Sequence, residues 1–353
     1  MKRVTVVVPG PLATRTGGSI YDRRIVEGLR TRRWTVPVVE LDAVAHPLAP
    51  PIYTAPPKFS AIPDETVVLI DGLVFGTMPH IIEHEAWRLR FIPIIHMPLA
   101  STPGLTRGEG AWLSNLERRA MQHARHVVIT GNKSRAAVQD LSGWADDGRI
   151  TRIPPGVDRP DESDWSRPES TRLWLLCVAN LTPGKGHEIL LKALADVTDT
   201  DWTLACAGSD TRDPQTASHL RKLAEDLGIA SRVLWRGELG DAALQDAYAT
   251  ADMFVLPTRG ETYGMAVAEA IAHGLPVIST RTGEIPSIVG EAGLLAEPGD
   301  AAGFASLITQ AISDSALRQR LRHSARQAAD ALPTWDQAVG SMEVVLTKVA
   351  ERG

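Results

Sequence analysis

The chain has 353 residues, of which 44% are hydrophobic, 22% charged and 5% aromatic, and its formal net charge at pH 7 is -5. These proportions exclude a disordered chain, a collagen-like repeat and a small disulfide scaffold. At about 150 residues per domain, the length predicts two domains, each large enough for a hydrophobic core of its own. Cys177 and Cys206 lie in apolar runs, so we expect buried thiols in a reducing compartment.

No segment has the pattern of a membrane span or of a secretory leader. The longest uncharged stretch, residues 91–106, contains three prolines and a histidine, whereas a span needs about 20 mainly apolar residues. After the basic residues Lys2 and Arg3, only residues 4–8 are apolar before Pro9, which is shorter than the core of a signal peptide. We therefore expect a cytoplasmic protein.

Charge is divided unevenly along the chain. Residues 1–155 hold 19 Lys and Arg against 14 Asp and Glu, whereas residues 156–353 hold 18 against 28. The early basic residues belong to a segment with helical apolar spacing and are Arg23, Arg24, Arg30, Arg32 and Arg33. They fit either a solvated helix face or a patch that contacts an anionic acceptor or the inner face of a membrane. Because no basic stripe is interleaved with aromatic residues, we expect no nucleic-acid partner.

Apolar runs alternate with helical patterns through the first part of the chain. Continuous apolar runs predict strands buried on both faces at residues 4–8, 67–70, 91–95 and 127–129. Helical spacing predicts helices at residues 18–33, 109–124 and 132–141. This alternation is typical of a parallel sheet with right-handed crossovers, so we expect a Rossmann-like domain over residues 1–158.

The same alternation restarts after residues 159–172, which are rich in proline and acidic residues and are typical of a linker. Strands are predicted at residues 173–178, 204–207, 233–235, 253–256 and 277–279. Helices are predicted at residues 187–197, 216–227, 241–249 and 263–273. We therefore expect a second doubly wound domain over residues 173–333. A helical segment over residues 334–353 follows, and one arrangement for it is packing back on the first domain.

In each domain, the loop that follows the first strand contains two glycines close together. The first ends with Gly17 and Gly18 before a helix, where the backbone can approach a ligand closely and free N–H groups suit phosphate. The second places Lys185 between two glycines, where an ammonium can meet a diphosphate. Neither loop has the spacing of a dinucleotide fingerprint or of an ATPase P-loop. Ordinary turn chemistry and a surface lysine are the alternatives.

Two acids stand eight positions apart in the segment RGETYGMAVAE. Glu261 comes just before an expected helix, where negative charge is stabilised, and a capping role is its alternative. Glu269 lies among alanines in that helix. A carboxylate is costly to bury there unless it accepts hydrogen bonds, and sugar hydroxyls are suitable donors.

Glu261 and Glu269 match the E-x7-E pattern of retaining glycosyltransferases of the GT-B architecture, and the chain resembles glycosyltransferase family 4. The similarity also covers residues 154–158, 178–194 and 258–300 and the loop of Gly17 and Gly18. It implies two Rossmann-like domains that face an interdomain cleft. It also implies retaining transfer of a sugar from a UDP- or GDP-sugar donor to an acceptor hydroxyl, without metal or cofactor.

The resemblance implies roles for individual residues of the second domain. Lys185 would bind the donor diphosphate, Glu269 the nucleoside ribose, and Glu261 the hydroxyls of the transferred sugar. Backbone N–H groups would help to hold the sugar and phosphate at Thr262, Tyr263, Gly264 and Met265.

In the first domain, the resemblance implies that Gly17 and Gly18 close on the phosphates. His96, which taken alone reads as a structural histidine, would touch the sugar near the reacting carbon. The chain departs from the family pattern at Asn180, where many relatives have an arginine, and at Ser287, where they have an acid. Leaving-group stabilisation would then depend more heavily on Lys185 and on helix N-termini.

Two other functions fit the same architecture. A sugar-nucleotide epimerase would convert the donor without an acceptor, and a non-catalytic module would bind a nucleotide without turnover. The acceptor stays open among a lipid, a glycan and a small molecule. Because the chain has no DxD motif and no His and Asp cluster with ligand spacing, we expect no metal site.

Overall fold

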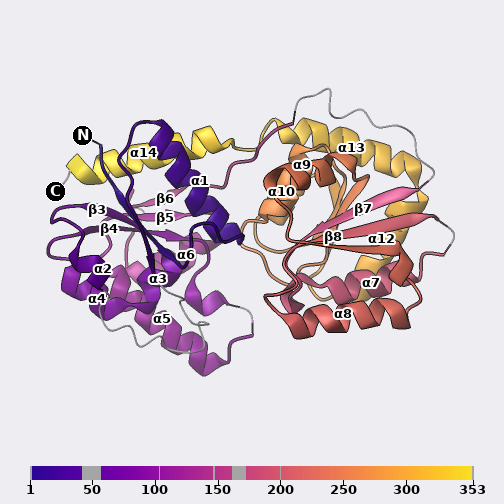
Figure 1. The fold of residues 1–353 in the computed structure, drawn as a ribbon, viewed down its shortest axis with the longest axis horizontal. Helices are drawn as coiled ribbons and strands as arrows, with labels where there is room; N and C mark the ends of the chain where they lie inside the picture. Colours follow the sequence, from indigo (N-terminus) through magenta and orange to yellow (C-terminus); the bar gives the residue numbers. More distant parts are fainter. Residues whose placement is uncertain are drawn as a thin grey trace. The chain divides into compact units, whose positions relative to one another are not determined.

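The computed structural model describes residues 2–41, 57–102, 104–145, 148–160, 172–198 and 200–351. The chain forms two compact units, drawn in Figure 1: unit 1 comprises Met1–Gly156 and Pro333–Gly353, and unit 2 comprises Val157–Leu332. Each unit contains a six-stranded sheet in which every pairing between strands is parallel. The predicted pair of doubly wound α/β folds is therefore confirmed. Most of the predicted linker, residues 161–171, lies outside the described residues.

Unit 1 has the strand order β2-β1-β3-β4-β5-β6. Its strands are β1 (Thr5–Pro9), β2 (Val38–Leu41), β3 (Val67–Asp71), β4 (Arg90–Ile95), β5 (Val127–Ile129) and β6 (Ile150–Arg152). Its α-helices are α1 (Gly17–Thr31), α2 (Pro57–Ser60), α3 (Gly72–Thr77), α4 (Pro79–Glu85), α5 (Arg107–Met121), α6 (Lys133–Ser142) and α14 (Trp335–Glu351). The strand order of this sheet therefore reverses between β1 and β3.

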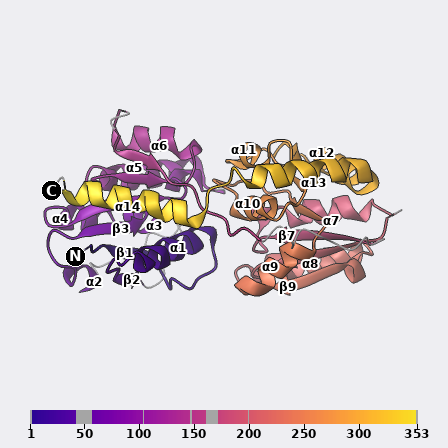
Figure 2. The same ribbon diagram turned by 90° about the horizontal axis from the view of Figure 1, so that it is seen from above.

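Two separate apolar cores cover the two faces of this sheet. Val6, Leu69 and Ile94 face a core shared with α1 and α14. The alternate residues Val7 and Ile70 face a second core shared with α3, α4, α5 and α6. This alternation explains why the strands are continuously apolar, because both faces are buried. In Figure 2, α14 runs alongside α1.

Unit 2 has the strand order β12-β11-β10-β7-β8-β9. Its strands are β7 (Leu173–Val178), β8 (Trp202–Ala207), β9 (Val233–Gly237), β10 (Met253–Leu256), β11 (Val277–Thr280) and β12 (Gly293–Ala296). Its α-helices are α7 (His187–Ala195), α8 (Pro214–Asp226), α9 (Asp241–Thr250), α10 (Met265–Ala272), α11 (Ile285–Val289), α12 (Ala301–Ser313) and α13 (Ser315–Ala329). Helices α9, α10 and α13 lie on one side of the sheet, and α7, α8 and α12 lie on the other (Figure 1). The strand order reverses between β7 and β10.

Local capping moves several helix boundaries away from the predicted ones. The helix predicted from residue 109 begins at Arg107, because Thr106 and Glu109 form a capping box. The helix predicted from residue 263 begins only at Met265, because Gly264 has a left-handed φ of 96°. Both cysteines are buried and free of disulfides, as predicted. Within the described residues, no helix combines the length and hydropathy that crossing a membrane requires.

Part of the basic cluster on α1 and at its C-terminal end serves the packing of unit 1. Arg32 forms ion pairs with Asp336 and Glu343 of α14, at 2.6 and 3.2 Å. Arg24 lies over the ring of Trp335, 5.6 Å from its centroid. These contacts attach α14 to α1, so the two arginines have a structural use. Contact of the cluster with a membrane stays a prediction.

Candidate functional site

The carboxyl edge of the sheet in unit 2 brings Lys185 and Glu261 together. Lys185 lies in the loop after β7 and Glu261 in the loop after β10, and these two strands are neighbours. Ligands of open α/β sheets bind outside the carboxyl ends of the strands where the strand order reverses, which is this point. The Lys185 ammonium forms an ion pair with the Glu261 carboxylate. Two residues predicted from separate motifs are thus direct neighbours.

Close backbone contacts fix the two loops against each other. Gly186 has a φ of +75°, and a Cβ there would lie 2.0 Å from the carbonyl oxygen of Pro257. Only glycine fits such a position. The N–H of Arg259 donates to the carbonyl of Gly184 at 2.8 Å, and the hydroxyl of Thr258 donates to the same oxygen at 3.3 Å. The lysine loop is therefore held by the chain that leads to the first acid.

A third loop, after β11, supports Glu261 from the other side. Its Thr282 hydroxyl accepts the N–H of Glu261 at 3.2 Å. The N–H of Glu284 donates to the carbonyl of Thr262 at 3.0 Å. At Gly283, with a φ of +57°, a Cβ would lie 2.3 Å from the carbonyl oxygen of Glu261. The backbone of Glu261 is therefore set by the loops of three strands.

Helix α10 begins between the two acids, and no side chain caps its N-terminus. Gly264 is the N-cap of α10, and no side chain makes a capping hydrogen bond there. The capping alternative for Glu261 is therefore wrong in this structure. Because the first N–H groups of a helix have no intrahelical acceptor, the start at Met265 offers donors and a partial positive charge. The Tyr263 side chain is buried.

Glu269 is held by a tyrosine that the sequence analysis did not identify. The Tyr248 hydroxyl donates to Oε2 of Glu269 at 2.8 Å, and its ring stacks on His273 with centroids 5.0 Å apart. Burial and the charge of Glu269 raise the pKa of Tyr248 well above its usual value, so the hydroxyl stays a donor. In sequence, an aromatic residue on an apolar helix face is indistinguishable from an ordinary core residue.

The two departures from the family pattern both have structural partners. Oδ1 of Asn180 accepts the N–H of Ser209 at 3.0 Å, which ties the loop after β7 to the loop after β8. The hydroxyl of Ser287 donates to the carbonyl of Glu284 at 2.8 Å. Asn180 thus contributes a hydrogen bond between loops and no charge, whereas Lys185 supplies a cation at this edge.

In unit 1, the glycine pair begins helix α1, one residue earlier than the helix predicted from residue 18. Gly17 and Gly18 are the first two residues of α1, because Thr16 caps the helix by accepting the N–H of Ser19 at 3.2 Å. A Cβ on Gly18 would lie 3.1 Å from Cδ2 of His96. Gly18 and His96 are therefore close neighbours, and the absence of a side chain at Gly18 makes room for the imidazole.

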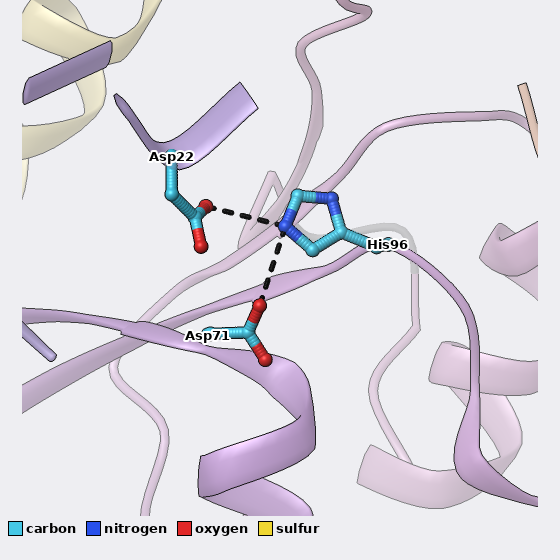
Figure 3. Close-up of side chains that lie close together, drawn as sticks. All are labelled: Asp22, Asp71 and His96. Atoms are coloured by element: carbon cyan, nitrogen blue, oxygen red, sulfur yellow. Dashed lines mark hydrogen bonds and ion pairs between the residues drawn. The ribbon is translucent and has the colours of Figure 1, made fainter. Parts of the chain in front are cut away.

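His96 also meets two buried acids, which were not predicted. Nε2 of His96 lies 3.2 Å from Oδ1 of Asp22 and 3.5 Å from Oδ2 of Asp71 (Figure 3). The ring nitrogen and the carboxylate oxygens of these three lie within 4.8 Å of one another, a grouping that the spacing in the sequence does not show. That the chain has no metal site stays a prediction. Residues 22, 71 and 96 are too far apart in sequence to form a motif. The sequence held one indication of a site residue, because Asp71 is an acid at the end of a buried strand, directly before a glycine.

Comparison with known sequences identifies the class of domain that unit 2 resembles. Residues 172–314 match the family model described as "Glycosyl transferases group 1". The chain is 32% identical over 225 residues to D-inositol 3-phosphate glycosyltransferase 1 of Catenulispora acidiphila, which covers 58% of this chain and 53% of that protein. It is also 32% identical over 249 residues to D-inositol 3-phosphate glycosyltransferase of Acidothermus cellulolyticus, covering 65% and 54%. The chain thus spans about half the length of the curated relatives that it matches.

Solved structures share the whole fold at low sequence identity. Sucrose-phosphate synthase from Thermosynechococcus elongatus has a TM-score of 0.80 at 20% identity, with full coverage of both chains. Anabaena Alr3699/HepE, solved in complex with UDP and glucose, has a TM-score of 0.76 at 18% identity, covering 99% of this chain and 100% of the other. At these identities the similarity shows the fold, which is that of the GT-B glycosyltransferases.

Proposed function

We propose that this protein is a retaining glycosyltransferase that moves a sugar from a UDP- or GDP-sugar to an acceptor hydroxyl. The observation that carries the proposal is the pairing of Lys185 with Glu261 at the reversal point of the sheet in unit 2. Both residues lie within residues 172–314, which match the group 1 glycosyltransferase model. The relatives named above are transferases, which favours transfer over the epimerase alternative.

The ion pair suggests how the site exchanges partners when a donor binds. A partly exposed pair of this kind contributes little stability by itself. A diphosphate carries more negative charge than one carboxylate, so it would draw the Lys185 ammonium away from Glu261. The released carboxylate would then accept hydrogen bonds from sugar hydroxyls. Glu269, held by Tyr248, would accept those of the ribose.

Stabilising the leaving group is the main chemical contribution in this proposal. As the glycosidic bond breaks, negative charge grows on the departing diphosphate, and Lys185 with the backbone N–H groups of residues 262–265 would stabilise it. The sugar would pass through an oxocarbenium-like state. The acceptor would attack from the same face and pass its proton to the departing phosphate, which gives retention without a metal. Gly17, Gly18 and His96 are the proposed ligand contacts of unit 1.

Replacing Lys185 tests the leaving-group role. Lys185→Ala removes the ammonium, and we expect sugar transfer to fall by roughly 10² or more, since loss of one preorganised electrostatic contact costs that much. The matched control is Lys192→Ala, because Lys192 is also ion-paired but is exposed on α7, 2.6 Å from Glu188. Near-normal turnover of Lys185→Ala with an intact fold would refute the role. Donors are first identified by screening UDP-, GDP- and dTDP-sugars for a rise in melting temperature.

Replacing Glu269 tests the ribose assignment. Glu269→Ala should weaken binding of the matching nucleoside diphosphate, measured by calorimetry, because the ribose hydroxyls lose their acceptor. Tyr248→Phe keeps the ring and removes the hydroxyl that holds Oε2, so we expect a smaller loss of affinity. Unchanged affinity in Glu269→Ala would remove the assignment. Conversion of the donor in the absence of any acceptor would instead indicate an epimerase, and tight binding without turnover a non-catalytic module.

A further inference from the structure

Three side chains of unit 1 converge where β3 and β4 end. Asp22 comes from α1, Asp71 from the last position of β3, and His96 from the residue after β4. Figure 3 shows both carboxylates directed at the same ring nitrogen, Nε2. Asp22 is 1% exposed and Asp71 6% exposed. Two buried carboxylates at one imidazole are costly unless they share its charge and its proton.

The surroundings hold the imidazole in one orientation. Gly18 lies against Cδ2 of the ring, where a Cβ would be 3.1 Å away. The Tyr21 ring meets the imidazole edge-on, with centroids 5.3 Å apart and planes at 78°, and its hydroxyl is fixed by donating to the carbonyl of Ile153 at 3.0 Å. Nδ1 lies on the side of the ring away from the carboxylates (Figure 3). The His96 side chain is 22% exposed.

Each carboxylate has a second oxygen that does not contact His96, and the two second oxygens differ in their hydrogen bonds. Oδ1 of Asp71 accepts the N–H of Leu73 at 2.7 Å, which caps α3. Oδ2 of Asp22 is buried, and no partner for it is found among the described residues. A buried acceptor without a donor is costly, and the contact of the other oxygen, Oδ1, with His96 helps to offset the cost of burying this acid.

The electrostatics of the cluster favour a cationic ring. Burial lowers the pKa of His96, but the Asp22 carboxylate, by charge and hydrogen bond, and the Asp71 carboxylate together raise it above its usual value. Burial and the charge of Asp22 raise the pKa of Asp71 to about 7, against the opposing effect of His96. The charged groups that act on the imidazole are thus Asp22 from α1 and Asp71 from β3. Tyr21 faces it as a neutral phenol, since burial raises the pKa of Tyr21.

We propose that Asp22 and Asp71 are positioning residues that hold the Nε2–H of His96 between them, so that the ring presents Nδ1–H as a fixed cationic donor. The ligand would be a phosphate or hydroxyl oxygen of the nucleotide sugar, and this part rests on the proposed function. A neutral, freely rotating histidine would supply neither the charge nor the direction. The arrangement follows the general rule that a carboxylate behind an imidazole fixes which nitrogen faces the ligand.

The test is an NMR titration of His96 in the full chain without ligand. Histidine ring resonances of the ¹⁵N-labelled protein are assigned with His96→Gln and followed against pH. We expect His96 to titrate above 6.5, the usual value, and its midpoint to fall by about one pH unit or more in Asp22→Asn and in Asp71→Asn. Asparagine at position 71 keeps an oxygen for the N–H of Leu73. Asp64→Asn is the control, because Asp64 is an exposed acid of the same unit, paired with Arg88.

Opposite results of this titration would overturn the proposal. One is a wild-type midpoint at or below the usual value, and another is the same midpoint in both variants. A third is stoichiometric binding of Zn²⁺, Mn²⁺ or Mg²⁺ that removes the His96 titration and is lost in both variants, which would make the cluster a metal site. Because the titration needs no substrate, its outcome is independent of sugar transfer. A lowered midpoint in both variants, in a protein that turns over no donor, would support the positioning role and reject the proposed function alone.

The pH profile of donor turnover is the functional readout. Transfer by the wild type should decline as His96 loses its proton, and the alkaline limb should move to lower pH in Asp71→Asn by the shift that NMR measures. A purely structural role would lower turnover equally at every pH, and that result would overturn the proposal.

Discussion

Glu117 is a buried acid of α5 whose ionisation opposes folding. It is 1% exposed, one carboxylate oxygen accepts the N–H of Leu99 at 3.0 Å, and the other has no partner among the described residues. Burial raises the pKa of Glu117 to about 7, only partly offset by the hydrogen bond from Leu99. Because the folded-state pKa is raised, the stability that this group contributes is present below about pH 4 and is lost as pH rises to about 7.

The neutral isostere Glu117→Gln should therefore remove this pH dependence. We expect the variant to gain unfolding free energy relative to the wild type as pH rises, by up to about 3 kcal/mol at pH 8, with the gain vanishing near pH 4. Urea unfolding of both proteins at pH 4.5, 6 and 8 measures it. Glu109→Gln on the same helix should shift in the opposite direction, because hydrogen bonds from Thr106 lower the pKa of Glu109. Identical pH slopes for wild type and Glu117→Gln would contradict the explanation.

Individual residues of the candidate site differ in how far sequence could locate them. Lys185 and Glu261 stand in loops directly after buried strands, so their meeting at a sheet edge follows from the topology of parallel sheets. Asp22 lies mid-helix, followed by two arginines, and nothing in that pattern separates it from a solvated acid. Its contact with His96 depends on how α1 packs on the sheet, which is set by residues distant in sequence.

Among the elements, helices α1 and α14 meet at a glycine. A Cβ on Gly28 would lie 2.3 Å from Cγ2 of Val339 and 3.2 Å from Cβ of Val339. The Val339 side chain therefore fills the space that a side chain at position 28 would need. Alanine would favour the helix by roughly 1 kcal/mol, but overpacking a filled core costs about 1–3 kcal/mol. We therefore expect Gly28→Ala to lower the unfolding free energy, measured by urea denaturation.

A second substitution separates overpacking from other causes. Val339→Ala removes the methyl groups that the new Cβ meets. We expect Gly28→Ala with Val339→Ala to be less destabilised than the sum of the two single variants, with a favourable coupling of about 1 kcal/mol or more. Strict additivity would show that the two side chains do not compete for the same space.

Elements also differ in how well their pattern predicts them. Strands that are buried on both faces, such as β3 and β10, were predicted within one residue at each end, because they form continuous apolar runs. Strands β2 and β12 lie at sheet edges and were not predicted. They are four residues long and largely half-buried. β2 is interrupted by Glu40, and β12 is a short apolar run that begins with a glycine and has no β-branched residue, so neither has a pattern that distinguishes a strand.

For the whole molecule, the main consequence of the fold is that the chain returns to unit 1 after residue 332. Helix α14 buries Ala338, Val339, Met342, Val345, Leu346 and Val349 in the core that it shares with α1 and with one face of the β1–β3–β4 sheet. Unit 2 has a core of its own, and no residue of α14 belongs to it. Damage to this helix should therefore be felt by unit 1 and not by unit 2.

Leu346 and Val344 provide a matched pair for that expectation. Leu346 is 0% exposed and Val344 is 67% exposed, two positions apart on the same helix. Leu346→Ala should cost unit 1 about 2–5 kcal/mol, whereas Val344→Ala should change stability by less than about 0.5 kcal/mol. Hydrogen exchange read by mass spectrometry should show faster exchange in β1, α1 and β3 of Leu346→Ala, with β7 and β10 unchanged. Equal loss of protection in both units would contradict this expectation. It would mean that the two cores unfold in one cooperative step, so that destabilising the core of unit 1 also lowers the unfolding free energy of unit 2.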